Sequence, residues 1–186
     1  MTSTDEYPLN EAQQRSHRLA LRLILPLTIL LAIIVVPLYL IYDVSKVEGH
    51  SMLPTLRNGD YLLITRGIDK PRRGDVLVIH VKNPDGSVSE IVKRAVGLAG
   101  DRGSVQGDYV TVNGRPEQFD HLAYFATSQW PTADVVIPPG YVYVLGDNRP
   151  VSSDSRFIGA LSLGDIHGKV VAVWFPVGRM RLVPSP

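Results

Sequence analysis

The apolar run from Leu19 to Tyr42 constrains this chain more than any other feature of its sequence. The run carries a single charge, Arg22, close to its start. An α-helix rises about 1.5 Å per residue, so about 20 residues span the roughly 30 Å hydrocarbon core of a bilayer. The sequence therefore predicts a transmembrane anchor over residues 19–42, preceded by a polar tail over residues 1–18.

A cleaved secretory peptide is the alternative to a retained anchor. Such peptides have an apolar core of about 7 to 15 residues and end in small residues of the A-x-A type. Here the run is longer, and residues 42–46 lack small residues at that spacing. Pro26 and Pro37 also suit a membrane helix, in which proline is more frequent than in soluble helices. These features favour an anchor that is retained.

The orientation of the anchor follows from its flanking charges. Arg15, Arg18 and Arg22 precede or begin the run, whereas Lys46 stands alone just beyond it. Because positive charge is retained on the cytoplasmic side, the N-terminus is predicted to be cytoplasmic. The chain is thus expected to be a single-pass protein of the cell membrane, in contact with the lipid bilayer, with residues 43–186 outside the cytoplasm.

Residues 43–186 are predicted to be mostly β, with an antiparallel sheet as the core. Short runs rich in Val, Ile, Leu and Tyr are separated by Gly, Pro, Asn and Asp, a spacing typical of such sheets. Gly-Asp turns recur between them, and Asn113-Gly114 indicates a hairpin. The predicted strands are 61–65, 76–81, 90–96, 109–112, 141–145 and 169–175. A small variable lobe is expected over about 103–140, although the pattern of 115–140 does not define its shape.

Composition excludes several classes of function. The chain has 19 Lys and Arg against 18 Asp and Glu, which does not suggest a nucleic-acid partner. It has no cysteine, so disulfides, thiol nucleophiles and thiolate metal sites are excluded. No metal and no other cofactor is expected, and we expect a monomer. The tripeptide Arg73-Gly74-Asp75 could suggest cell adhesion, but its place in a turn before a strand favours a structural role.

Ser51 is the first candidate for chemistry. It lies in the turn-rich stretch "GHSMLPTLRNGD", a few residues beyond the apolar run. A serine hydroxyl is a weak nucleophile and needs a neighbouring base, which here could be a histidine or a lysine. The histidines occupy unremarkable settings, and each is better explained as structural or solvated. They are His17, His50, His80, His121 and His167.

Lys93 is the stronger candidate for the base. In "EIVKRAVG", alternation along a strand places Lys93 and Arg94 on opposite faces, so at least one cation faces the interior if either face packs. Burial would disfavour the charged ammonium. A base useful at pH 7 to 8 needs a pKa about two to three units below the usual value, roughly 3 to 4 kcal/mol of desolvation. An exposed edge lysine is the alternative.

A third polar segment, "GDNRPVSSDSR" from Gly146, follows directly on a predicted strand. In a functional interpretation Ser152 orients the amine of Lys93, while Asp154 and Arg156 form an ion pair that holds the loop. Alternatively the segment is a surface loop stabilised by local side-chain turns.

Together these segments resemble the bacterial type I signal peptidases in their compact, single-anchor form. The resemblance rests on "SMLPTL", "RRGDVLVI", "VKRAVGLAGD" and "GDNRPVSSDSRFIG", in the family's order after an anchor. It implies a serine endopeptidase that removes signal peptides from exported preproteins. Ser51 would be the nucleophile and Lys93 its general base, with Ser152, Asp154 and Arg156 in support.

The resemblance also implies how a precursor is bound. Val47, Met52, Leu56 and Val92 would line small apolar pockets that favour A-x-A-like sites, although each could equally be a core residue. The backbone N–H of Ser51 would serve the oxyanion, and Gly49 stands where some members carry a helpful serine. Two alternatives remain open: a peptidase of the same fold dedicated to one substrate class, and a non-catalytic, anchored β binding module.

Overall fold

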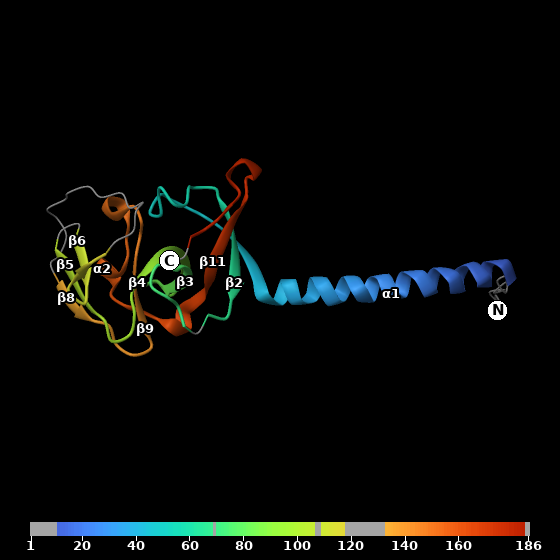
Figure 1. The fold of residues 1–186 in the computed structure, drawn as a ribbon, viewed down its shortest axis with the longest axis horizontal. Coiled ribbons are helices and arrows are strands. Elements are labelled where there is room, and N and C mark those ends of the chain that lie inside the picture. The colour runs from blue at the N-terminus through green and yellow to red at the C-terminus, as the bar shows by residue number, and fades with distance from the viewer. Residues whose placement is uncertain (1–10, 69, 107–108, 118–132, 185–186) are drawn as a thin grey trace. The chain divides into compact units, whose positions relative to one another are not determined.

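A computed structural model of the chain describes residues 11–68, 70–106, 109–117 and 133–184. It divides into two compact units, one ending at Leu40 and the other beginning at Ile41 (Figure 1). Helix α1 spans Glu11–Ile41 and contains Pro26 and Pro37. Its stretch Leu21–Ile41 is long and apolar enough to cross a membrane. The N-terminal apolar helix is consistent with a single-pass anchor.

The second unit consists of two antiparallel sheets. The larger has the strand order β1-β2-β11-β3-β4-β9-β10, with β12 beside β11. The smaller has the order β7-β6-β5-β8. The larger sheet comprises β1 (Tyr42–Lys46), β2 (Tyr61–Arg66), β3 (Val76–Lys82), β4 (Val88–Gly97), β9 (Tyr141–Leu145), β10 (Leu161–Ser162), β11 (Ile166–Phe175) and β12 (Arg181–Leu182). The smaller comprises β5 (Arg102–Gln106), β6 (Tyr109–Val112), β7 (Arg115–Pro116) and β8 (Ala133–Val136).

Short helices complete the unit. They are η1 (Arg149–Val151), α2 (Ser155–Ile158), η2 (Leu163–Asp165) and η3 (Val177–Arg179). Helix α2 is capped by Asp154, whose side chain accepts a hydrogen bond from the backbone N–H of Arg156. This cap satisfies one of the N–H groups that a helix leaves free at its start. The loop after β9 therefore folds back as η1 followed by α2.

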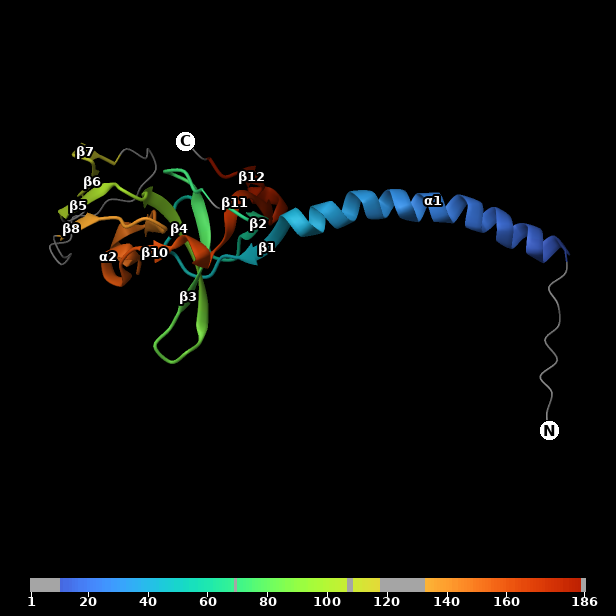
Figure 2. The same cartoon turned by 90° about the horizontal axis from the view of Figure 1, so that it is seen from below.

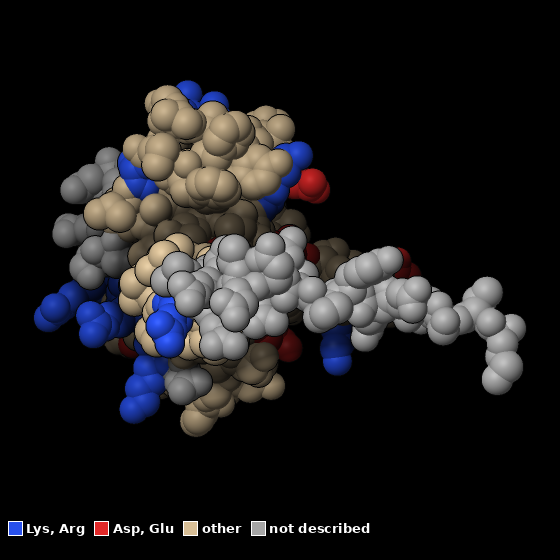
Figure 3. All heavy atoms as spheres, turned by 90° about the vertical axis from the view of Figure 1, so that its right-hand side faces the viewer, with Lys and Arg blue, Asp and Glu red and all other residues tan. Residues whose placement is uncertain are grey.

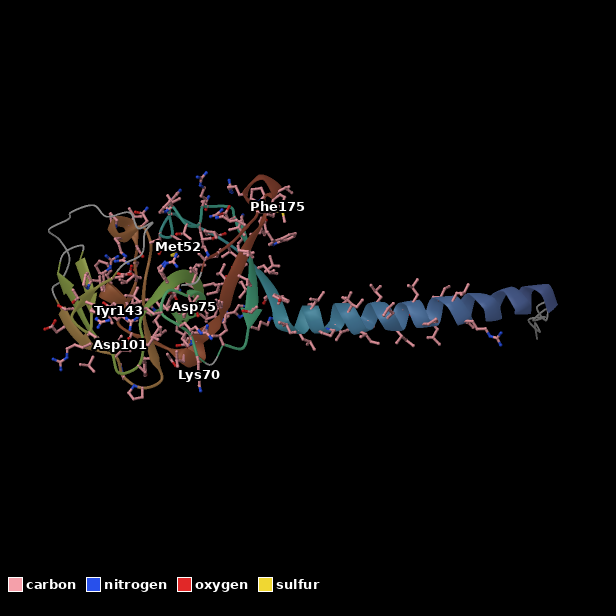
Figure 4. All side chains as sticks on the ribbon, in the orientation of Figure 1. Met52, Lys70, Asp75, Asp101, Tyr143 and Phe175 are labelled. Atoms are coloured by element: carbon pink, nitrogen blue, oxygen red, sulfur yellow. The ribbon has the colours of Figure 1, made fainter. Side chains whose placement is uncertain are left out.

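The larger sheet is strongly curled. Three strands separate β1 from β4 in the strand order, which would place them about 19 Å apart in a flat sheet. Yet Ser45 on β1 donates a hydrogen bond to Glu90 on β4. One core lies inside this curl, and Met52 marks its position in Figure 4. Its buried members are Val47, Met52, Leu56, Leu62, Ile64, Val76, Val78, Val170, Val173 and Val183.

The smaller sheet packs against β4 and β9 through a separate apolar cluster. Val96, Tyr143 and Leu145 of the larger sheet meet Val110 and Val112 of β6 there. Figures 1 and 2 show β5, β6 and β8 together at the side of the unit where α2 lies. Figure 2 also shows the β3–β4 hairpin projecting from the rest of the unit.

The predicted fold class, mostly β after one N-terminal apolar helix, is confirmed. All six predicted strands exist, and four of them are longer than predicted: β2, β3, β4 and β11. Asn113 and Gly114 adopt left-handed backbone angles, φ 55° and 75°, in the turn that joins the paired strands β6 and β7. Residues 118–132, which contain His121 and most of the segment of undefined shape, lie outside the described residues.

Charged groups lie both on the surface and in the interior. Lys and Arg side chains stand out on the face shown in Figure 3, where few Asp and Glu are visible. Among the described residues, the buried charged ones are Asp60, Asp75, Lys93, Arg94, Asp147, Arg149 and Asp154. The Arg73-Gly74-Asp75 tripeptide is structural, because Arg73 is paired with Asp101 and Asp75 is almost fully buried.

Candidate active site

The loop between β1 and β2 holds Ser51. Backbone hydrogen bonds between Val47 and Asp60 (2.8 Å), and between Gly59 and Val47 (2.9 Å), close this loop at its base. Within it, the buried side chains of Met52 and Leu56 anchor the chain in the core. The position of Ser51 is therefore fixed by the residues around it rather than by a strand of its own.

Lys93 approaches Ser51 from β4. Its Nζ lies 2.8 Å from Ser51 Oγ and 3.0 Å from the carbonyl oxygen of Val92. The Lys93 side chain is only 4% exposed. Burial lowers the pKa of Lys93, and this outweighs the opposing attraction of Asp154 and Asp147. The geometry thus brings together a hydroxyl and an amine that is partly deprived of water.

The two carboxylates near Lys93 are neutralised by arginines. Asp147 pairs with Arg94 at 2.7 Å, and Asp154 pairs with Arg156 at 2.7 Å. All four side chains of these pairs are at most 1% exposed. Because each carboxylate already has a cationic partner, its pull on the proton of Lys93 is weakened. Arg156 also acts directly to lower the pKa of Lys93.

Ser152 lies in the third segment, close to Ser51. A Cβ atom added at Gly146 would come within 2.2 Å of Ser152 Oγ and 2.5 Å of the Ser51 carbonyl oxygen, so both are packed against Gly146. The Asn148 backbone N–H also donates to the Ser51 carbonyl, at 2.9 Å. Ser152 Oγ is buried and has no hydrogen-bond partner among the described residues. The predicted bond from Ser152 to Lys93 is not formed in this structure.

A buried network behind Lys93 was not predicted. Arg94 donates two hydrogen bonds to Asp147, at 2.8 and 2.7 Å, and one to the Gly74 carbonyl at 2.7 Å. Thr55 Oγ1 donates to Asp147 Oδ2 at 2.5 Å. The network joins the Ser51 loop, the turn before β3, β4 and the loop after β9. Strand alternation at Lys93 and Arg94 indicated only that at least one of the two cations faces the interior, and a buried guanidinium needs a carboxylate partner.

A groove of about 590 Å³ runs from this pair along β1 and β4. Of the four predicted pocket residues, Val47, Met52 and Val92 line it. Leu56 is fully buried in the core and is not part of the groove wall. Sequence alone could not separate wall from core here, because Leu56 lies one helical turn after Met52, with a hydrogen bond between their backbones.

The two predicted oxyanion positions differ in availability. The Gly49 N–H donates to Asn58 Oδ1 at 3.0 Å, and Gly49 has a φ of +91°, which favours glycine there. The Ser51 N–H has no such partner among the described residues. Gly49 thus shapes the loop, while the Ser51 N–H is free to donate.

The histidines whose side chains are described make other contacts. His80 lies 3.4 Å from Glu90, and His167 lies 2.9 Å from Asp43. Their rings stack with centroids 4.8 Å apart. His50 is exposed. In the described part of the chain, the side chain hydrogen-bonded to Ser51 Oγ is that of Lys93, not a histidine.

Comparison with known proteins identifies the family. The family described as "Signal peptidase, peptidase S26" matches residues 20–175, most of the chain. The chain belongs to the signal peptidase family. A signal peptidase I of Leptolyngbya laminosa is 35% identical over 77% of this chain and 74% of the relative. One of Bacillus caldolyticus is 34% identical over 70% and 78%.

A further relative agrees with this assignment. A signal peptidase IB of Staphylococcus aureus is 32% identical over 75% of this chain and 81% of the relative. The crystal structure of a signal peptidase I from Enterococcus faecalis aligns with a TM-score of 0.46 and 27% identity, covering 55% of this chain and 98% of that one. The family predicted from the four motifs is confirmed.

Proposed function

We propose that Ser51 and Lys93 form the catalytic dyad of this member of the signal peptidase I family, a serine endopeptidase that removes signal peptides from preproteins. The observation that carries the proposal is the 2.8 Å distance between Ser51 Oγ and Lys93 Nζ, with Lys93 buried. A neutral amine at that distance can accept the proton of a hydroxyl as it attacks.

The reaction then proceeds in two steps. Ser51 Oγ attacks the scissile carbonyl carbon while its proton passes to Lys93, and the leaving amine takes that proton as the C–N bond breaks. An acyl-enzyme ester remains on Ser51. A water molecule, deprotonated by Lys93, attacks the ester and releases the acid, and the proton returns to Ser51. The Ser51 N–H stabilises the oxyanion of both tetrahedral intermediates.

The precursor binds as an added strand in the groove. Strand β1 pairs only with β2 in the described sheet, and β4 pairs with β9 only over Arg94–Gly97, so Val88–Lys93 has an open edge. An extended peptide between these edges gains backbone hydrogen bonds, and alternate side chains enter pockets. Val47, Met52 and Val92 leave space for small residues, which accounts for cleavage after A-x-A-like sites.

The loop after β9 supports the dyad. The Asp154–Arg156 pair fixes the turn, and Arg156 also donates to the carbonyls of Arg149 (2.8 Å) and Ser152 (3.3 Å). This cross-linking holds Ser152 beside Ser51. From its place in the family's motif, Ser152 orients the amine of Lys93 through its hydroxyl.

The protein acts at the membrane surface as a monomer. Residues 19–42 anchor it, the tail over 1–18 is cytoplasmic, and the catalytic unit over 43–186 lies outside, where exported preproteins emerge. The cluster Arg15, Arg18 and Arg22 supports this orientation. The lobe over about 103–140 belongs to the catalytic unit.

Cleavage of a purified precursor by the full-length protein in detergent tests the dyad. Ser51→Ala and Lys93→Ala are each expected to lower kcat by about 10³-fold or more, since general-base catalysis alone contributes about 10² to 10⁴. Lys82→Ala, which removes an exposed lysine at the end of β3, is the matched control and keeps full activity. Loss of cleavage on replacing His80, His121 or His167 instead would indicate a histidine mechanism.

Substrate range separates the remaining alternatives. We expect several unrelated precursors with A-x-A-like sites to be cleaved at comparable rates. Cleavage of a single precursor would indicate a dedicated peptidase. Binding without cleavage by the wild-type protein would indicate a binding module.

A further inference from the structure

A polar contact crosses the groove at some distance from the dyad. Ser45 Oγ on β1 donates a hydrogen bond to Glu90 Oε1 on β4, and both residues line the groove that ends at Ser51 and Lys93. Ser45 is buried, whereas the Glu90 side chain is 36% exposed. The contact therefore spans the space that a bound peptide would occupy.

The position of the contact along the groove can be converted into a position in the substrate. Glu90 precedes Lys93 by three residues on β4, about 10 Å along an extended strand. A peptide strand lying beside β4 advances by one residue for each residue of β4. The residue just before the cleaved bond lies beside Lys93, so Glu90, three residues away on β4, faces the fourth residue before that bond. The third residue is the small one of an A-x-A-like site.

Glu90 has no strong cationic partner. In the described residues no Lys or Arg forms an ion pair with it, and its closest basic group is His80 Nε2 at 3.4 Å. His80 stacks on His167, and His167 contacts Asp43, which is paired with Arg66. Asp43, the other carboxylate of this cluster, thus already has a cationic partner in Arg66. Glu90 keeps an available negative charge in the path of the substrate.

We propose that Glu90 is a specificity-determining residue, which favours precursors with Lys, Arg or another hydrogen-bond donor four residues before the cleaved bond and disfavours Asp and Glu there. Ser45 holds the carboxylate across the groove, and the substrate side chain replaces Ser45 on binding. The inference rests on the proposed function and adds a polar subsite beyond the small apolar pockets. For a partly exposed ion pair the preference amounts to about fivefold in kcat/KM.

The test compares precursors that differ at one residue. Versions with Lys, Ala or Glu at the fourth residue before the cleaved bond, each with small residues kept at the first and third, are cleaved by the full-length protein in detergent. The wild-type protein is expected to cleave the Lys version about fivefold faster, by kcat/KM, than the Glu version. Glu90→Gln should abolish this ratio and Glu90→Lys should reverse it.

A second groove carboxylate provides the control. Glu48 also lines the groove, and Glu48→Gln should leave the Lys-to-Glu ratio as in the wild type. Cleavage of the Ala version by Glu90→Gln shows that this variant is folded. If the wild type cleaves the Ala version but the ratio is unaffected by Glu90→Gln, or is lost in Glu48→Gln, the Glu90 inference is wrong. If the wild type cleaves no version, the proposed function itself fails.

Discussion

The reactive nitrogen of Lys93 lies in the protein interior, where burial disfavours the charged form. Catalysis needs the neutral amine, so activity should rise with pH as Lys93 loses its proton. Because burial lowers the pKa of Lys93, the midpoint of the rise should lie below the ordinary lysine pKa of about 10.4. The pH at which activity rises is measured from the profile of kcat/KM against pH. Enzyme returned from high pH to pH 8 should recover its activity, which excludes unfolding as the cause of a change. A rise that only begins near pH 10 would contradict a buried base.

Gly146 is a glycine because of its crowded surroundings and not because of its backbone angles. Gly59, Gly74 and Gly100 begin Gly-Asp turns with positive φ, but Gly146 does not. Glycine is required there by crowding, because an added Cβ would meet Ser152 and the Ser51 carbonyl within 2.5 Å. Its substitution must therefore displace part of the site.

Gly146→Ala is accordingly expected to lower kcat by about 10²-fold, the effect of misplacing reactive groups by about 1 Å. Gly164→Ala is the matched control, since an added Cβ there meets only Ser162 Oγ at 3.5 Å and the residue also begins a Gly-Asp pair. Precursor cleavage by both variants measures the effect on the active site, and thermal unfolding of both measures any effect on the stability of the fold. Full activity in Gly146→Ala would mean that the loop has room to move.

At the scale of elements, the sequence identified the strands with strong apolar patterns and missed those without one. Strand β5, "RGSVQ", has a single apolar residue, and β1 follows the apolar helix without a break. Helix α2 has only four residues and depends on the Asp154 cap. Ser51, Lys93 and Ser152 could be predicted as site residues because each lies in a recognisable motif. The contact between Ser45 and Glu90 depends on the curl of the whole sheet, which no local pattern encodes.

The smaller sheet is linked to the loop after β9 by one buried ion pair. Glu117, just after β7, accepts a hydrogen bond from Arg149 NH2 at 2.6 Å, and Arg149 Nε donates to the Gly146 carbonyl at 2.9 Å. Both side chains are at most 3% exposed. Burial raises the pKa of Glu117 despite this partner. The pair ties the smaller sheet to the loop that carries Ser152.

Glu117→Ala should therefore destabilise the protein by about 3 kcal/mol at pH 7, because Arg149 loses the hydrogen-bond acceptor that Glu117 offers in the interior. Denaturant unfolding measures the loss, with Asp134→Ala, at an exposed carboxyl on β8, as the control. The raised pKa gives a second signature. Between the usual and the raised pKa the folded protein holds a proton that the unfolded chain has lost, so stability falls as pH rises through this window. Glu117→Ala should remove that slope, and an unchanged slope would exclude Glu117 as its source.

At the scale of the whole molecule, the dyad is useful only on the side of the membrane where precursors emerge. The proposed orientation can be tested by thiol labelling of single-cysteine variants. The chain has no cysteine of its own that would add background labelling. Ser3→Cys places a thiol in the tail, and Val177→Cys places one at a position that is 73% exposed in the β unit. In intact cells a membrane-impermeant maleimide should label Val177→Cys, whereas Ser3→Cys should react only after permeabilisation. The reverse pattern would put the dyad in the cytoplasm, and a chain that removes signal peptides from exported proteins could not act there.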